Sequence, residues 1–144
     1  MRRNFTQLYV HLVWATWDRL PLITPEIQEP IYNVIAYECE QMGCRLVAIG
    51  GIEDHVHVLA GFPPNLAISD LVKQIKGSSS HCTNHQIKPD AFFKWQGSYG
   101  AFTVNLQELE GVAAYIKNQA KHHRQNTQRP NWELASPSVA SPNK

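Results

Sequence analysis

The sequence predicts an α+β fold of the ferredoxin-like type, a split βαβ arrangement in which an antiparallel sheet carries helices on one face. An additional C-terminal helix follows this core. Two observations support the prediction. The expected elements run β-α-β-β-α-β and then helix, which is the order of the split βαβ motif. The 144 residues suit one domain, and 43% hydrophobic against 17% charged residues provide a core and exclude global disorder.

The first half of the chain predicts a strand and a helix. Residues 5–17 are rich in β-branched and aromatic residues, with apolar side chains on both faces, so we expect a central strand. Thr24 and Pro25 form a typical helix start, and the apolar pattern continues until Gly43 ends it. Pro30 lies inside this pattern, so either the first turn is irregular or the helix begins there.

The remaining elements follow from the same periodicities. Residues 44–51 and 55–62 predict two strands joined by a connection of hairpin length. A helix capped by Asn65 is expected to extend to about residue 86. Residues 92–104 contain a short fourth strand, and a final amphipathic helix spans about 106–125.

Residues 1–129 are expected to form the single domain, and residues 130–144, rich in Pro, Ser and Asn, a loose tail. No run approaches the roughly 18 apolar residues of a membrane span, and the N-terminus has no apolar signal core. The three cysteines are an odd number without framework spacing, so we expect reduced thiols. These features predict a cytoplasmic protein without a membrane partner.

The net charge of +1 hides an asymmetry along the chain. Residues 1–72 carry four Lys or Arg and eight Asp or Glu, whereas residues 73–144 carry nine and four. Between Lys117 and Arg129 there are four basic residues, two histidines and no acid. A basic patch is the usual footprint of a protein that binds phosphate backbones, although a solvated helix face explains it equally well.

A pair of histidines carries the first chemical signal. His55 and His57 lie two residues apart on a predicted strand and therefore project from one face. Structural histidines are more common, but two beside an acidic turn indicate a divalent-metal site with positions open for water or phosphate. Mg²⁺ or Mn²⁺ would suit the site if an oxygen ligand joins, and Gln119 can supply that oxygen.

Tyr115 carries the second signal. It shares a helix face with Gln119, and the apolar stripe of that helix is complete without it, so we expect a displayed hydroxyl. A phenol with a pKa near about 10 is a poor nucleophile at neutral pH and needs a metal or base beside it. Lys117, Lys121 and Arg124 on the same helix are candidate DNA contacts.

Other candidate nucleic-acid contacts lie in the second helix and after it. Lys73 and Lys76 are expected to meet phosphates, with the serines after Gly77 either helping them or capping a broken helix. Trp95 and Tyr99 can stack on unpaired bases, although packing at the sheet edge explains them equally well.

Taken in order, these residues resemble the HUH-type single-tyrosine transposases of IS200-like insertion sequences, with REP-associated tyrosine transposases as close relatives. Each motif alone is weak, but the ordered set is specific and extends over about residues 5–125. The matching segments are Tyr9-Val-His-Leu-Val-Trp-Ala-Thr16, His55-Val-His57, Lys76-Gly-Ser-Ser79, Trp95-x-Gly-x-Tyr99 and Tyr115-Ile-x-x-Gln119-x-x-x-His123.

The resemblance implies a single-stranded DNA transposase that cleaves and rejoins strands at element ends through a covalent 5′-phosphotyrosine. Tyr115 would be the nucleophile, and His55, His57 and Gln119 would bind Mg²⁺ or Mn²⁺. The implied substrate is single-stranded DNA with hairpins. The implied assembly is a homodimer in which the tyrosine helix of one subunit can complete the metal site of the other.

Two alternatives stay open at this point. A non-catalytic protein with a ferredoxin-like sheet can bind single-stranded nucleic acid by stacking, which explains Trp95 and Tyr99 but not the histidines or Tyr115. A metal-dependent hydrolase using His55 and His57 alone would turn over without a covalent intermediate.

Overall fold

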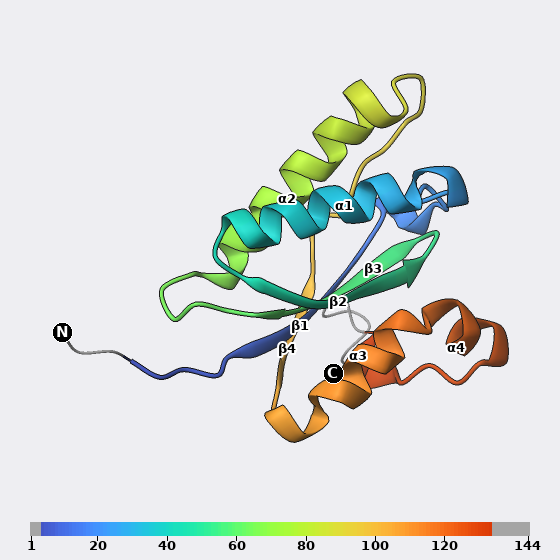
Figure 1. The fold of residues 1–144 in the computed structure, drawn as a ribbon. Coiled ribbons are helices and arrows are strands. Elements are labelled where there is room, and N and C mark those ends of the chain that lie inside the picture. The colour runs from blue at the N-terminus through green and yellow to red at the C-terminus, as the bar shows by residue number, and fades with distance from the viewer. Residues whose placement is uncertain (1–3, 134–144) are drawn as a thin grey trace, which may run out of the picture.

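A four-stranded antiparallel sheet in the order β2-β3-β1-β4 organises the computed structural model, which describes residues 4–133. The strands are β1 (Tyr9–Ala15), β2 (Arg45–Ile52), β3 (His55–Gly61) and β4 (Gly100–Val104). Strand β3 pairs antiparallel with both β1 and β2, so it lies between the two strands that the first helix connects. This topology confirms the α+β ferredoxin-like, split βαβ fold (Figure 1).

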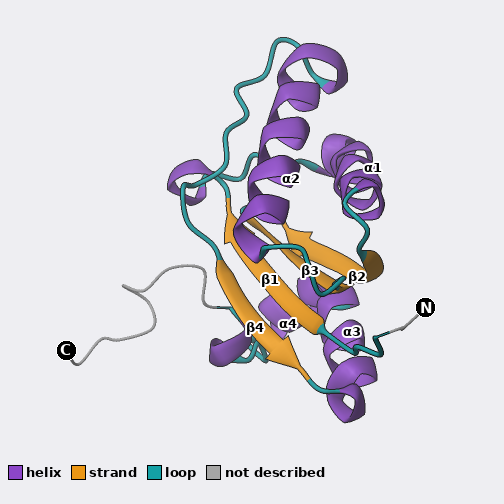
Figure 2. Cartoon of the chain, turned by 90° about the vertical axis from the view of Figure 1, so that its left-hand side faces the viewer, coloured by secondary structure: helices purple, strands orange, loops and turns teal. Residues whose placement is uncertain are grey.

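Helices α1 (Pro25–Gln41) and α2 (Ile68–Cys82) cover one face of the sheet (Figure 2). Because strand residues alternate between faces, every second residue of the two central strands points toward these helices. The strand residues in this core cluster are Val10, Leu12 and Trp14 of β1 and Val56, Val58 and Ala60 of β3. Pro30 lies inside α1, so the helix begins before it.

Helices α3 (Leu109–Lys117) and α4 (Gln119–Gln125) lie on the opposite face (Figure 1). Val112 and Ile116 of α3 pack on Ala48 and Leu59 of the sheet in a second apolar cluster. The residues of β1 and β3 that alternate with the first core set point toward α3 and α4. They include three fully buried histidines, His11, His55 and His57. Both faces of the central strands are therefore covered within one chain.

The helical segments differ in detail from the sequence expectation. The single helix expected over 106–125 is a 3-10 turn (Leu106–Glu108) followed by α3 and α4, with a break at Asn118. The Asn118 side chain donates to the Ala114 carbonyl at 2.8 Å, a bond that competes with the backbone helix pattern. Helix α2 has Ala67 rather than Asn65 as its N-cap, and it continues beyond Cys82 as a π-helical turn.

The segment after residue 129 also packs against the domain. Pro130–Trp132 form a 3-10 turn, and the Trp132 ring meets the Tyr115 ring edge-on at 5.0 Å between centroids. The first four residues of the expected loose tail, 130–133, are thus ordered against α3, and residues 134–144 lie outside the described residues. Among the helices of residues 4–133, none has the length and apolar character needed to cross a membrane.

Gly50 of β2 sets how closely α3 approaches the sheet. A methyl group at Gly50 would lie 2.1 Å from the Ile116 backbone oxygen, so we expect Gly50→Ala to displace α3 and destabilise the fold by about 1–3 kcal/mol. Gly111→Ala is the matched control on α3, because nothing lies within 4 Å of its added methyl and helix propensity favours it by up to about 1 kcal/mol. Urea unfolding of both variants tests this, and equal stabilities would refute the close-approach argument.

Candidate active site

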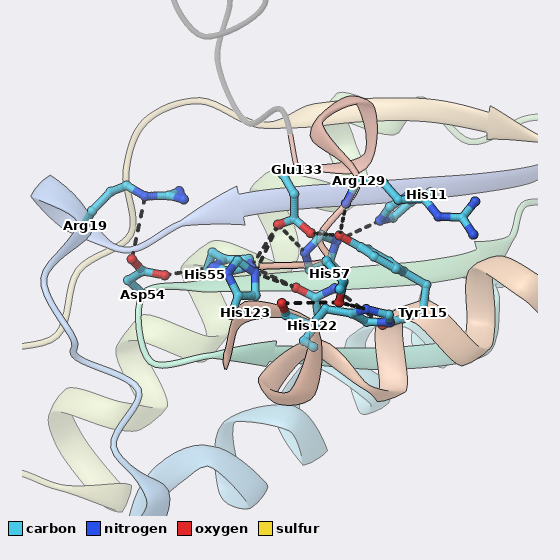
Figure 3. Close-up of polar contacts among 12 residues, drawn as sticks. His11, Arg19, Asp54, His55, His57, Tyr115, His122, His123, Arg129 and Glu133 are labelled. Atoms are coloured by element: carbon cyan, nitrogen blue, oxygen red, sulfur yellow. Dashed lines mark hydrogen bonds and ion pairs between the residues drawn. The ribbon is translucent and has the colours of Figure 1, made fainter. Parts of the chain in front are cut away.

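Strand β3 directs two imidazoles into one buried site on the α3 and α4 face (Figure 3). The Nε2 atoms of His55 and His57 lie 3.2 and 3.1 Å from Oε1 of Glu133. These three side chains form the one group of potential metal ligands among the described residues, with their donor atoms within 4.8 Å of one another. Gln119 Oε1 lies 3.1 Å from His55 Nε2, so the three metal ligands expected from the sequence do come together.

Glu133 is the site residue that sequence reasoning missed. It follows the 3-10 turn of residues 130–132, a segment whose composition indicated a loose tail. One signal was present: Glu133 is the single acidic residue after Glu110 in the full sequence. An isolated carboxylate in a basic half of the chain is a candidate partner for buried cationic groups.

Tyr115 is buried, not displayed on a polar flank, with 4% of its surface exposed. Its hydroxyl donates to Oε2 of Glu133 and accepts from the backbone N–H of Arg129 at 2.9 Å. The ring stands edge-on to His57 at 6.1 Å between centroids. The apolar stripe of α3 did not indicate this burial, because Trp132 from a distant turn covers the ring.

The two histidines differ in charge because their partners differ. Burial acts to lower the pKa of His55, but hydrogen bonds with Asp54 and Glu133 outweigh it and raise the pKa to about 9. Burial lowers the pKa of His57. Burial alone would raise the pKa of Glu133, yet hydrogen bonds from the histidines hold it well below its usual range. At neutral pH the site therefore holds a carboxylate, an imidazolium and a neutral imidazole.

Each histidine also has a partner on its second ring nitrogen. His55 Nδ1 lies 2.7 Å from Asp54 Oδ1, and Arg19 stands 3.7 Å from the other oxygen of that carboxylate. His57 Nδ1 lies 2.8 Å from His11 Nε2. Metal-binding histidines usually engage their second nitrogen in this way. Two oriented imidazoles with a carboxylate and an amide oxygen form a donor set that fits a divalent metal.

The phenol beside this cluster is protonated in the conformation described. Burial and the hydrogen bond to Glu133 raise the pKa of Tyr115 to about 12, above the ordinary value near 10. The Glu133 carboxylate is ionised and already accepts the hydroxyl proton, so it is positioned to receive that proton. The site thus brings together a buried hydroxyl, a proton acceptor and side chains of the kinds that bind divalent metals.

Two residues expected to bind DNA have contacts within the domain that the sequence did not indicate. Lys76 Nζ donates to the backbone carbonyls of Gln96 and Ser98 at 2.7 and 2.9 Å, tying α2 to the segment before β4. Trp95 is 6% exposed and donates from Nε1 to Ser79 Oγ at 2.8 Å, so its ring is in the core and cannot stack on a base. A sequence pattern does not separate such buried contacts from exposed ones.

The other basic candidates are exposed. Lys117, Lys121 and Arg124 lie on α3 and α4, the helices that carry Tyr115 and Gln119. Lys73 is exposed on α2, which covers the opposite face of the sheet. DNA contact by these four residues stays a prediction, and only the first three lie on the helices that form the site.

Comparison with known proteins points to one family. The family model described as "Transposase IS200 like" matches residues 4–119. The chain is 28% identical to the ISDra2 transposase TnpA of Deinococcus radiodurans over 118 residues, which cover 78% of this chain and 84% of that protein. It is 26% identical to the transposase of insertion sequence element IS200 of Salmonella typhimurium over 124 residues, 82% of this chain and 80% of that protein.

Two solved structures share the fold. A crystal structure from Deinococcus radiodurans R1, described as a candidate transposase, superposes with a TM-score of 0.62 at 29% identity and covers 83% of this chain and 95% of that one. A REP-associated tyrosine transposase bound to a REP hairpin superposes with a TM-score of 0.63 and covers 100% of this chain and 87% of that one. At 13% identity, the second comparison supports the fold alone.

The contacts of Lys76 lead to a prediction about stability. We expect Lys76→Met to lower the free energy of unfolding by about 1.5–3 kcal/mol, because two backbone carbonyls lose their charged hydrogen-bond donor. Lys73→Met, on the same helix and exposed, should change it by less than about 0.5 kcal/mol. Chemical unfolding measures both. A Lys76 variant that lost DNA affinity without losing stability would favour phosphate binding as the role of Lys76.

Lys76 also predicts a pH dependence. Burial lowers its pKa to about 8, whereas the unfolded chain keeps a value near 10.5. Between these values the unfolded state binds more protons than the folded state, so the free energy of unfolding contributed by Lys76 should rise with pH. The difference between wild type and Lys76→Met, measured from pH 7 to about 10.5, isolates this contribution. A difference that falls across the window would contradict the lowered pKa.

Proposed function

The chain belongs to the IS200-like transposase family, and from this premise we propose that it cleaves and rejoins single-stranded DNA through a covalent 5′-phosphotyrosine. One observation carries the proposal. The Tyr115 hydroxyl and the Nε2 atoms of His55 and His57 meet the same carboxylate, that of Glu133. A nucleophile next to metal-type ligands is the arrangement that attack on a phosphodiester requires.

We assign a divalent ion, Mg²⁺ or Mn²⁺, to His55, His57 and Glu133, with Gln119 beside them as the amide ligand. When bound, the ion would polarise the scissile phosphate and offset the charge that develops on the leaving oxygen. The oxygen donors of Glu133 and Gln119 favour a hard cation of this kind. Because the pKa of His55 is raised, its proton must leave before its Nε2 can bind metal.

The chain's own residues then account for strand transfer. The Tyr115 oxygen attacks phosphorus while its proton leaves along the hydrogen bond to Oε2 of Glu133, which passes the proton onward because its lowered pKa does not let it keep the proton. The bond from phosphorus to the phenolic oxygen forms as the bond to the 3′ oxygen breaks, and that oxygen takes up a proton to become a free hydroxyl. The phosphotyrosine keeps the energy of a phosphodiester, so a 3′-hydroxyl can reverse the step and join strands without ATP.

The proposed substrate is single-stranded DNA with hairpins, and exposed Lys117, Lys121 and Arg124 supply positive charge on the helices of the site. A homodimer is the assembly implied by the family resemblance. The rings of Tyr115 and His57 of one chain lie edge-on with centroids 6.1 Å apart, which favours attack within one subunit.

The non-catalytic binding alternative has less support. Stacking on a ferredoxin-like sheet requires an open sheet face with exposed aromatic rings. Here α3 packs on that face, and Trp95 is buried in the other core. The hydrolase alternative leaves the contact between Tyr115 and Glu133 without a role.

Tyr115→Phe tests the nucleophile. The substitution removes the attacking oxygen and keeps the ring that packs against Trp132, so we expect covalent adduct formation to fall by about a thousandfold or more. Affinity for a hairpin-bearing DNA strand should stay within about threefold of wild type. Denaturing gels of protein incubated with Mn²⁺ and DNA from its own gene's flanks measure the adduct.

Mass spectrometry of the wild-type adduct provides the control, since the nucleotide must map to Tyr115. Chelation of the metal should abolish the adduct and leave the folded protein intact. An undiminished adduct in Tyr115→Phe would remove the nucleophile assignment, and metal-dependent cleavage without any adduct would favour the hydrolase.

A mixing experiment tests whether the site is shared. Tyr115→Phe lacks the hydroxyl and His57→Ala lacks a metal ligand. If each active site is formed within one chain, no chain in a mixture of the two variants has a complete site. We therefore expect the co-refolded mixture to stay inactive in the adduct assay. Restored activity, up to about a quarter of the wild-type level because half of the dimers are mixed and each has one complete site, would mean that the tyrosine helix acts on its partner's histidines.

A further inference from the structure

We propose that His11 is a positioning residue that holds His57 in the tautomer able to bind a metal, an inference that rests on the proposed function. His11 lies on β1 and His57 on β3, diagonally across the strand pair in which His57 faces Val13. Both side chains are buried, and His11 Nε2 lies 2.8 Å from His57 Nδ1.

The argument starts from the two nitrogens of His57. A neutral imidazole carries one N–H and one lone pair, and the hydrogen bond at one nitrogen decides which nitrogen has the proton. His57 Nε2 points to Glu133 and the metal-type ligands (Figure 3). A metal at Nε2 needs the lone pair there, so the proton must be on Nδ1. An N–H at Nδ1 in a buried site needs an acceptor, and His11 Nε2 is within hydrogen-bond distance.

The same bond can also run in the opposite direction. If His11 Nε2 donates, His57 Nδ1 is the acceptor and its proton is on Nε2, where it donates to Glu133 Oε1 at 3.1 Å. His57 in that tautomer has no lone pair for a metal. In the metal-binding arrangement both rings carry their proton on Nδ1, so the pair as a whole neither gains nor loses a proton. The direction of this hydrogen bond therefore decides whether His57 Nε2 is free for a metal or donates to Glu133.

His11 is held in place for this role. Its ring stacks on His57 with centroids 5.1 Å apart and planes inclined by 27°. Phe102 and Trp132 contact it from two other sides, at 6.0 and 6.4 Å between centroids. A ring enclosed in this way cannot rotate its Nε2 away from His57 without displacing its neighbours.

The chemistry of His11 differs from that of the partner of His55. Asp54 brings a carboxylate oxygen to 2.7 Å from Nδ1 of His55. An imidazole acceptor instead fixes orientation and tautomer without adding a negative charge. The two histidines thus have different partners on Nδ1, and the partner of His57 acts on its tautomer.

The test compares two substitutions of His11. His11→Phe keeps a ring but removes the acceptor, whereas His11→Gln keeps an oxygen acceptor at a similar reach. We expect the Mn²⁺ affinity of the DNA-free protein to fall about 10- to 100-fold in His11→Phe and only a few-fold in His11→Gln. Calorimetric titration measures the affinity, and Phe102→Leu, which alters the packing around His11 without touching this hydrogen bond, is the matched control.

A spectroscopic measurement on the wild-type protein complements the variants. Long-range proton–nitrogen correlation spectra of ¹⁵N-histidine-labelled protein with Mg²⁺ should show that the His57 ring is protonated at Nδ1. This measurement keeps the proposal testable if His11→Phe does not fold. The variants' melting temperatures are recorded in the absence of metal to separate a loss of stability from a loss of metal affinity.

Three results would overturn the proposal. The first is wild-type Mn²⁺ affinity in folded His11→Phe, and the second is equal weakening in the Phe, Gln and Phe102→Leu variants. The third is a His57 proton on Nε2 in the metal-loaded protein. The first two leave the proposed function intact, and the third also removes His57 from the proposed ligand set. A wild-type protein that binds no Mn²⁺ overturns the metal site and this inference together.

Discussion

The carboxylate of Glu133 is the interaction on which the site depends. It is largely buried, and a buried charge is tolerated only when hydrogen bonds and opposite charge surround it. Its two oxygens have different partners. Oε1 contacts the histidines of β3, and Oε2 accepts a hydrogen bond from the phenol of Tyr115. The same contacts attach the segment after α4 to the sheet, so charge compensation and tertiary structure are coupled here.

Much of the site could be predicted because it follows local periodicity. Residues i and i+2 of a strand share a face, which brought His55 and His57 together, and helical spacing placed Tyr115 near Gln119. Glu133 contacts His57 across 76 residues from a turn with no repeating pattern. Such a contact depends on how the chain returns to the sheet, and no local rule encodes that path.

The same limit explains why the intramolecular contacts of Trp95 and Lys76 were not predicted. Trp95 belongs to an isolated bridge with Thr16, and its burial is set by that long-range pairing. Lys76 occupies an ordinary helical position, but its ammonium group reaches two carbonyls of a later segment. A helix pattern gives the direction of a side chain but not what the rest of the fold brings to it. The fold itself was predictable because its long helices have an apolar period and its first strand is rich in β-branched and aromatic residues.

The site draws on residues from both ends of the domain, His11 near its start and Glu133 near the end of the described chain. Synthesis delivers these groups in sequence order, and the Glu133 carboxylate emerges from the ribosome after the strands and helices of residues 4–132. Until then the buried imidazoles lack their compensating charge and Tyr115 lacks its partner. In the order of synthesis, the strands of the sheet therefore precede the carboxylate that completes the site.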